Sequence, residues 1–274
     1  MTQSPPGPPA LPPSPGAPRP FGAPAAPPSG PRPVSVRLPF GKVRMTYVFL
    51  ALITLVFVGQ LASEQLLGGD ILIALGAKVN IYIAQGEYWR LLTAVFLHAS
   101  VLHYGFNAYA LYVLGRQVET FSGALRFSLL FLLSGLSGSV FSLLFNQSAS
   151  IGASGAIFGL IGALAVFLYR HRTLFGERGR RNLQQIVVIA LINFAIGLQG
   201  GIDNWAHLGG LIGGLTLGWF LGPVWALRQG PLLGAQPVIE DTRPMGPNQW
   251  AAVLIFLVVV AVLSVVGGSL AATG

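Results

Sequence analysis

The chain has 274 residues, of which 53% are hydrophobic and only 9% are charged, and this balance excludes an ordinary soluble domain. Its net charge of +8 would suggest a nucleic-acid partner in a soluble protein. Here the basic residues flank hydrophobic runs, as topology signals do, so we expect a polytopic membrane protein that binds no nucleic acid. The chain contains no cysteine, which excludes disulfides, thiol nucleophiles and cysteine metal sites.

Residues 1–40 hold 15 of the 20 prolines, with glycine, alanine and serine between them and no acidic residue. Such a segment cannot build an apolar core, so we expect a disordered, Pro-rich tail. A ligand for an SH3-type domain is the alternative to a solvated tail. The segment has no apolar stretch of the kind that a signal peptide needs.

After the tail, charged residues separate long uncharged intervals. The longest, between Arg126 and Arg170, is long enough for two crossings of about 20 residues each, with a turn at 146–150. We expect seven transmembrane helices, at 45–62, 98–115, 125–145, 153–169, 183–200, 204–222 and 250–270. The predicted fold is all-α. It consists of a six-helix membrane core at 45–222, a linker at 223–249 and one additional C-terminal helix at 250–274.

Lysine and arginine divide unequally between the two sides that these spans define. Fourteen lie on the side of the N-terminal tail, and only Lys78 and Arg90 lie on the other. Because positively charged loops stay in the cytoplasm, we expect a cytoplasmic N-terminus and linker and an external C-terminus. The sequence shows no organellar targeting signal, so we expect the membrane to be a bacterial plasma membrane.

Residues 151–162 place the hydroxyl of Ser154 among small residues at the start of an expected helix. G-x-S-G alone is a weak signal, because a lone serine in a membrane helix usually serves packing. Three further polar residues, His103, Asn107 and His207, fall at a similar depth near the outer surface. Intramembrane polar residues that share one depth are candidates for function.

Small residues indicate which helices meet. Gly155 and Gly159 form a G-x-x-x-G in the fourth expected helix, and a longer stripe of small residues runs along the sixth. Such stripes allow close backbone approach. If they face each other, Ser154 and His207 come within reach as nucleophile and general base. The alternative is that the glycines serve packing alone and that His207 is an interhelical hydrogen-bond donor.

Acyl transfer also needs hydrogen-bond donors for the developing oxyanion. The first backbone N–H groups of a helix have no intrahelical partner, so Ser154 can offer its own. His103 and Asn107 are four residues apart and share one helix face. Together these three groups fit an oxyanion hole, although each side chain alone is more often structural.

The separated motifs together resemble the rhomboid family of intramembrane serine proteases, over about residues 45–222. The matching motifs are Trp89-Arg90 in the external connection, His98, His103 and Asn107 in the second span, Glu119 to Gly123 as E-x-x-x-G, Gly152 to Gly155 as G-x-S-G, and Ala206 to Gly210 as A-H-x-G-G.

The resemblance implies a Ser154–His207 dyad without an acidic third member, and an oxyanion hole made by His103, Asn107 and the Ser154 N–H. It implies single-pass membrane proteins as substrates, cut within the lipid bilayer near the outer end of a transmembrane helix. No metal or other cofactor is expected. Supporting roles are expected for Gly152, Gly155, Phe158, His98, Trp89, Arg90 and Glu119. Phe158 replaces a tyrosine of some members, and either ring can stack on an imidazole.

Two other functions stay open at this point. A catalytically inactive relative could bind membrane helices, although the presence of both Ser154 and His207 disfavours it. A small-molecule transporter would need discontinuous helices in repeated halves, and the sequence has no convincing internal repeat. A membrane metalloprotease would need H-E-x-x-H, which is absent.

Overall fold

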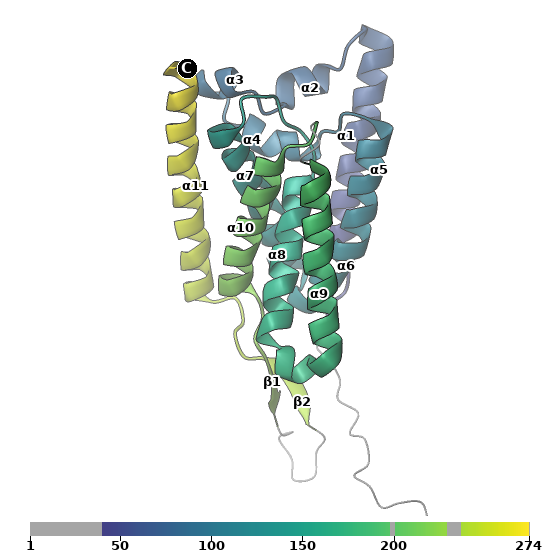
Figure 1. Cartoon of the computed structure of the whole chain (residues 1–274), viewed down its shortest axis with the longest axis vertical. Helices are drawn as coiled ribbons and strands as arrows, with labels where there is room; N and C mark the ends of the chain where they lie inside the picture. The colour runs from purple at the N-terminus through teal and green to yellow at the C-terminus, as the bar shows by residue number, and fades with distance from the viewer. Residues whose placement is uncertain (1–39, 198–200, 229–236, 274) are drawn as a thin grey trace, which may run out of the picture. The chain divides into compact units, whose positions relative to one another are not determined.

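The computed structural model describes residues 40–197, 201–228 and 237–273, which are mostly helical (Figure 1). The helices are α1 (Met45–Leu67), α2 (Ile71–Gly76), α3 (Asn80–Ala84), α4 (Arg90–Thr93), α5 (Val101–Ala110), α6 (Arg116–Ser122), α7 (Ala124–Phe145), α8 (Ser154–Arg170), α9 (Arg172–Gly197), α10 (Asn204–Leu221) and α11 (Pro247–Thr273). A 3-10 turn, η1 (Ala94–Phe96), follows α4, and a π-helical turn, η2 (Leu111–Gly115), joins α5 to α6. The expected tail, apart from Phe40, lies outside the described residues, as do residues 198–200 of the fifth expected span.

The long helices run between two ends of the bundle that differ in structure. One end carries α2, α3, α4 and the loop 146–153, and we call it the Ser154 end (Figure 1). The other carries two short strands, β1 (Trp225–Arg228) and β2 (Val238–Asp241), and we call it the hairpin end.

Glycines bring α8 and α10 into close contact at the centre of the bundle. An ideal Cβ on Gly210 would lie 1.9 Å from the carbonyl oxygen of Gly155, and one on Gly214 would lie 1.9 Å from that of Gly159. Both distances are far below van der Waals contact, so neither position can carry a side chain at this spacing. The two stripes of small residues therefore face each other, which was the condition for Ser154 and His207 to come close.

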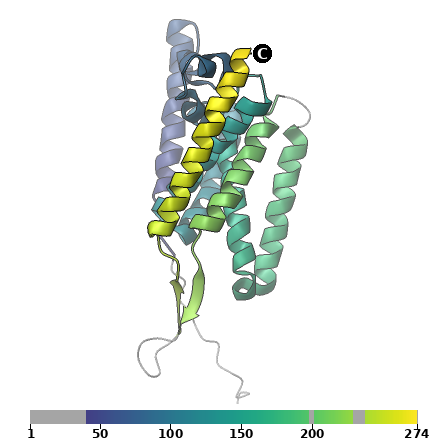
Figure 2. The ribbon, with the colours of Figure 1, turned by 90° about the vertical axis from the view of Figure 1, so that its left-hand side faces the viewer.

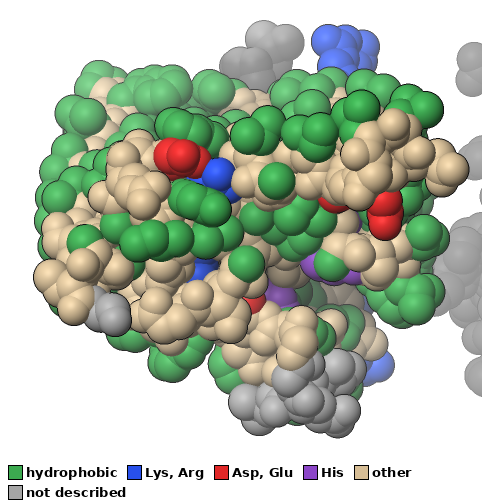
Figure 3. Space-filling model, turned by 90° about the horizontal axis from the view of Figure 1, so that it is seen from above, with side chains coloured by type: hydrophobic (Ala, Val, Ile, Leu, Met, Phe, Trp, Pro, Cys, Tyr) green, Lys and Arg blue, Asp and Glu red, His purple; other side chains and the backbone are tan. Residues whose placement is uncertain are grey.

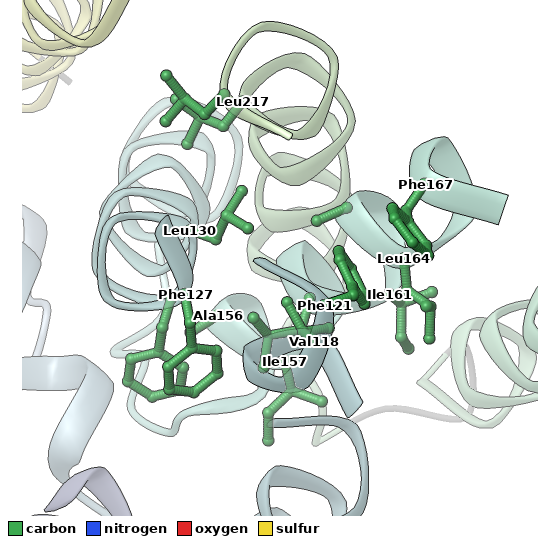
Figure 4. Packing of buried hydrophobic residues seen from close by; sticks show 14 of the residues in the cluster. Val118, Phe121, Phe127, Leu130, Ala156, Ile157, Ile161, Leu164, Phe167 and Leu217 are labelled. Carbon is green, nitrogen blue, oxygen red and sulfur yellow. The ribbon is translucent and has the colours of Figure 1, made fainter. Parts of the chain in front are cut away.

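Apolar side chains fill the space between α6, α7, α8 and α10 below the Ser154 end (Figure 4). Phe127 and Leu130 of α7 and Ile161 of α8 are almost completely buried. The rings of Phe121 and Phe167 stack with centroids 3.8 Å apart, which joins α6 to α8. Close packing of this kind, rather than transfer from water, holds helices together in a bilayer.

The second expected span differs from the structure at both ends. The helix begins only at Val101, where the Ser100 hydroxyl caps it by accepting a hydrogen bond from the His103 N–H (3.1 Å). It continues past Arg116 to Ser122, because a charged residue ends an apolar run without ending a helix. The backbone turns away at Gly123, where φ is 79°. The prediction of 98–115 was therefore wrong by several residues at each end.

The interval 170–181, expected as a loop, belongs mostly to α9. Its arginines and Glu177 are good helix formers, so the helix extends beyond the apolar run that the sequence marks. The only break is at Gly176, which has a φ of 51°.

The expectation of an all-α chain needs one correction, within the linker expected at 223–249. There β1 and β2 pair antiparallel, with Trp225 opposite Asp241. Arg126 of α7 forms an ion pair with Asp241 (2.6 Å), which ties the hairpin to the bundle. Strands of four residues are too short to show a reliable alternation of polar and apolar residues, so the sequence did not reveal them.

Three helices, α1, α7 and α11, are long and apolar enough to cross a membrane, and α8 is a shorter apolar helix. They coincide with four of the seven expected spans, and the other three fall on the α5–α6 segment, α9 and α10. The C-terminal helix α11 packs against α3 and α7 (Figure 2). An ideal Cβ on its Gly267 would meet Leu143 of α7 at 2.9 Å.

Candidate functional site

A cavity of about 670 Å³ lies at the Ser154 end, with residues of α5, α8, α9 and α10 in its walls. Figure 3 views the molecule from this end and shows histidine side chains within a recess. Four polar residues singled out in the sequence, His103, Asn107, Ser154 and His207, all line this cavity. Their predicted proximity therefore exists in the fold, although they come from three different helices.

Ser154 is the first residue of α8 and is only partly buried. The chain reaches it through Gly152, whose φ of 125° is a conformation that other residues rarely adopt. The Gly152 N–H donates to the carbonyl oxygen of Ala94 (2.8 Å), which fixes the turn against η1. As a first-turn residue, Ser154 has a backbone N–H without an intrahelical acceptor.

His207 lies in the first turn of α10, behind the capping residue Asp203. An Asp203 carboxylate oxygen accepts from the backbone N–H groups of Trp205 and Ala206, each at 3.1 Å. The Phe158 ring stacks on the His207 imidazole with centroids 4.3 Å apart and planes 12° apart. The expectation that Phe158 can stack on the imidazole is thus realised in the structure.

The ring nitrogens of His207 form no hydrogen bond to a protein group among the described residues. Its Nδ1 is buried and has no hydrogen-bond partner among the described residues. The described residues also contain no hydrogen bond between Ser154 and His207. Such bonds are often long before substrate binds, so the shared cavity is the relevant observation.

His103 presents a hydrogen-bond donor to the same space. Its Nδ1 accepts from the Ala99 N–H (3.2 Å), so in the neutral ring the hydrogen is on Nε2. An ideal Cβ on Gly152 would lie 2.7 Å from that Nε2 and 3.9 Å from the Ser154 hydroxyl oxygen. The imidazole N–H and the hydroxyl therefore face one small volume, which only glycine at position 152 leaves open.

Asn107 lies one turn after His103 and also lines the cavity. Its side-chain amide donates to the His103 carbonyl oxygen (2.8 Å), which fixes its orientation. An amide group carries two hydrogens, so a second donor is left for a group in the cavity.

Three other residues expected to support the site do not line the cavity. His98 precedes α5, and its backbone N–H and carbonyl both bond to the Gln60 side chain (2.9 Å each). The Trp89 indole N–H donates to the Leu75 carbonyl oxygen (3.2 Å). Arg90 pairs with Glu87 (2.6 Å) and also donates to one backbone carbonyl within α2 and to the one that directly follows it. These contacts shape the segment between α1 and α5.

Glu119 lies in α6, toward the hairpin end of the bundle, where its carboxylate contacts the N-terminal end of α1. Its carboxylate accepts from the backbone N–H groups of Arg44, Met45 and Thr46 and from the Thr46 hydroxyl, at 2.7–2.8 Å. It thus binds the N–H groups at the start of α1 that no helical carbonyl can reach. The structure gives Glu119 a role in helix packing, with no contact to the cavity.

Sequence reasoning missed several residues at the Ser154 end. Ser139, Ser150 and Asn193 line the cavity beside the expected residues. Lys78 is fully buried next to the loop 146–153. Two signals in the sequence pointed to Lys78: it is one of only two basic residues on the external side, and the chain has just one other lysine, Lys42.

Comparisons with known proteins agree on one family. A family model for the Rhomboid domain matches residues 85–224, a range that contains every residue lining the cavity. The chain is 43% identical over 183 residues to Rhomboid protease GluP of Bacillus subtilis, a match that covers 66% of this chain and 36% of that protein.

Two plant proteins match over a shorter stretch. The mitochondrial RHOMBOID-like protein 6 of Arabidopsis thaliana is 43% identical over 149 residues, covering 54% of this chain and 48% of that protein. RHOMBOID-like protein 1 of the same plant is 41% identical over 142 residues, a match that covers 52% of this chain and 36% of that protein. The matched stretch therefore spans less than half of each of these three relatives.

Proposed function

Because the chain belongs to the rhomboid family, we propose that this multi-pass membrane protein is an intramembrane serine endopeptidase with a Ser154–His207 dyad. One observation carries the proposal. Ser154 and His207 line one cavity, and the imidazole stacks on Phe158 while its Nδ1 has no hydrogen-bond partner in the described part of the chain. A serine hydroxyl becomes a strong nucleophile only when a base can take its proton, and His207 is that base.

The reaction proceeds in two halves. The Ser154 oxygen attacks the carbonyl carbon of the scissile bond while His207 accepts the hydroxyl proton. When the tetrahedral intermediate collapses, the C–N bond breaks and His207 returns the proton to the leaving amine. Water then attacks the acyl ester with His207 again as base, which releases the acid and restores the Ser154 hydroxyl.

The oxyanion of each tetrahedral intermediate accepts hydrogen bonds from the cavity wall. The donors are the backbone N–H of Ser154, the Nε2–H of His103 and the free amide hydrogen of Asn107. The fixed positions of His103 and Asn107 support this role, because donors that need no reorganisation stabilise a transition state most effectively.

The substrates are single-pass membrane proteins, whose transmembrane helix approaches from the lipid. The walls of the cavity include Phe106 of α5 and Ile189 of α9, which are 71% and 50% exposed. Exposed apolar side chains next to a polar cavity suit a helix that moves from lipid to the site. Polar side chains in the wall support access of the water that hydrolysis consumes.

The Ser154 end faces the outside in this proposal, since fourteen of the 16 basic residues lie on the opposite side. The six core helices at 45–222 and the additional helix at 250–274 give seven crossings, with the tail at 1–40 and the linker at 223–249 in the cytoplasm. The membrane is a bacterial plasma membrane. Cleavage near the outer end of a substrate helix then releases an external fragment.

Incubation of the purified full chain with a single-pass model substrate in proteoliposomes tests the proposal. We expect cleavage in the outer part of the substrate helix, located by mass spectrometry, and no cleavage by Ser154→Ala. Ser128→Ala is the matched control, because this serine of α7 bonds only to the Ala124 carbonyl and lies outside the cavity. A cut at the cytoplasmic end contradicts the orientation, and cleavage that survives Ser154→Ala contradicts the dyad.

A further inference from the structure

Lys78, between α2 and α3, is fully buried. Its Nζ donates three hydrogen bonds, to the Asn80 side-chain oxygen (2.9 Å) and to the carbonyl oxygens of Asn146 (2.8 Å) and Ser148 (2.9 Å). An ammonium has three hydrogens, so every one is paired. Burial of a charge costs several kcal/mol, and an apolar residue would fill the same space without this cost. The charge therefore calls for an explanation beyond packing.

The same lysine is joined to the loop 146–153 through its backbone. Its N–H donates to the Ser150 carbonyl oxygen (3.1 Å), and the Ser150 N–H donates to the Lys78 carbonyl oxygen (3.0 Å). The Asn80 amide adds bonds to the carbonyl oxygens of Leu143 and Asn146 (3.2 Å each). The loop is thus fastened at Asn146, Ser148 and Ser150 to the α2–α3 connection.

The fastened loop leads directly into the site. Ser150 and Gly152 line the cavity, and Ser154 follows two residues after the glycine. The Gly152 N–H bond to the Ala94 carbonyl oxygen is a further backbone link of this turn. A shift of the loop would move the Ser154 hydroxyl and N–H relative to His103 and His207.

We propose that Lys78 is a positioning residue for the proposed hydrolysis, whose ammonium holds the loop 146–153 so that Ser154 and its oxyanion donors stay aligned with His207. It acts through the loop and does not touch the reacting atoms. The proposal rests on the proposed function, and it adds a residue and a pH dependence that the dyad alone does not require.

Few charged groups face this ammonium. Asp203, the capping residue of α10, acts on it electrostatically. Arg90 of α4 donates to the Ala77 carbonyl oxygen (3.1 Å), directly before Lys78, and lies over the ring of Tyr82 in α3. The loop 146–153 contains no titratable side chain, and neither does α2.

Burial lowers the pKa of Lys78 from 10.5 to about 8, although Asp203 acts to raise it. Above that pH the neutral amine keeps two hydrogens for three acceptors, so the hold on the loop weakens. The effect on global stability has the opposite sign. Because the folded pKa lies below the unfolded one, the unfolded chain binds more protons between about pH 8 and 10.5, and this residue's contribution to stability rises with pH.

The test is the pH dependence of substrate cleavage by the full chain in detergent. The wild type should lose activity above about pH 8 without a parallel loss of thermal stability. Lys78→Arg keeps its charge at these pH values, so its profile should lack this decline. Lys78→Met should lower kcat about 10- to 100-fold relative to wild type below about pH 8, with a smaller change in KM, because small displacements of reacting groups are costly. Above about pH 8 this difference in kcat should shrink. Lys42→Met, at the other lysine, is the matched control and should behave as wild type.

Hydrogen exchange of peptides that cover 146–153 tests whether Lys78 holds the loop, independently of whether the Ser154–His207 dyad is catalytic. Faster exchange in Lys78→Met than in Lys42→Met supports the hold on the loop, even if the wild type cleaves nothing and the proposed function fails. An active wild type whose decline near pH 8 is retained in Lys78→Arg overturns the proposal. Equal exchange of the loop in the two methionine variants overturns it as well.

Discussion

Each end of the bundle has a buried histidine packed against a phenylalanine of α8, but the ring nitrogens of the two histidines differ in their hydrogen bonds. At the hairpin end, His171 packs on Phe167 with centroids 4.4 Å apart. Its Nδ1 bonds to the Phe167 carbonyl oxygen and its Nε2 accepts from the Trp225 N–H, both at 2.8 Å. At the Ser154 end, His207 stacks on Phe158, yet its Nδ1 has no partner among the described residues.

This contrast teaches that burial and aromatic contact do not identify a reactive histidine. Both imidazoles are more than nine-tenths buried and both touch a ring. The difference is unmet hydrogen-bonding capacity beside a cavity, which a structure rarely keeps without a function. Both nitrogens of His171 are occupied by hydrogen bonds, Nδ1 within α8 and Nε2 to the hairpin, so neither is free to accept a proton from a reacting group.

The largest expected effect comes from exchanging each histidine for alanine. His207→Ala should lower kcat by about 10³-fold, since general base catalysis supplies a factor of this size, while the melting temperature changes little. His171→Ala should keep kcat and lose about 2 kcal/mol of stability, because it leaves the Trp225 N–H unpaired. Cleavage assays and thermal melts of both variants measure the changes in kcat and in stability. A lower kcat in a folded His171→Ala would show that His171 also takes part in catalysis, contrary to this account.

A smaller loss is expected when Asn107 changes to alanine. Removal of one oxyanion donor costs about 3 kcal/mol in the transition state, which corresponds to roughly a hundredfold loss in kcat. KM should change little, because the oxyanion exists only after the attack by Ser154. Steady-state kinetics with a soluble fragment of a model substrate separate the two constants. A variant whose main change is in KM would assign Asn107 to substrate binding instead.

The smallest effect concerns Glu119, whose carboxylate caps α1 toward the hairpin end. Burial acts to raise its pKa, but hydrogen bonds from the backbone of Arg44, Met45 and Thr46 and from the Thr46 hydroxyl hold the pKa below its ordinary range. A carboxyl group whose pKa is lower in the folded protein than in the unfolded chain adds to the free energy of unfolding at pH values above its unfolded pKa. This contribution is lost as the pH falls and the carboxylate becomes protonated.

Glu119→Gln should therefore unfold more easily at pH 7, by about 1.5–3 kcal/mol, and the difference from wild type should shrink toward pH 4. Denaturant unfolding in detergent at the two pH values measures both quantities. Glu177→Gln is the control, because that side chain is 65% exposed and pairs only with Arg180. A difference between Glu119→Gln and wild type that stays constant with pH would show that the carboxylate charge is not what stabilises α1.

Local patterns in the sequence predicted the seam between α8 and α10 and the start of α8 at Ser154. Both features could be predicted because each depends on residues close together in the sequence: small residues spaced four apart in one helix, and a serine that follows a polar turn. The depth of His103, Asn107 and His207 followed from counting along helices of known rise. That these residues line one cavity could be seen only in the folded structure. The resemblance to the rhomboid family had already implied that they act together.

Other features could not be predicted because their partners are distant in sequence. Glu119 bonds to Arg44, 75 residues away, and the Lys78 ammonium bonds to Asn146, 68 residues away. Neither contact leaves a periodic pattern. Supporting roles were expected for Trp89 and Arg90 from their motif alone, and the structure shows that both side chains bond to backbone carbonyls of α2.

Covalent labelling of Ser154 tests the central claim most directly, because a fluorophosphonate probe reacts only with a serine whose proton a nearby base can accept. The full chain in detergent should be labelled, and mass spectrometry should locate the adduct on Ser154. Ser154→Ala should abolish labelling, His207→Ala should reduce it severely, and His171→Ala should leave it unchanged. A folded wild type that does not react, or an adduct that persists in His207→Ala at the wild-type rate, would contradict the Ser154–His207 dyad.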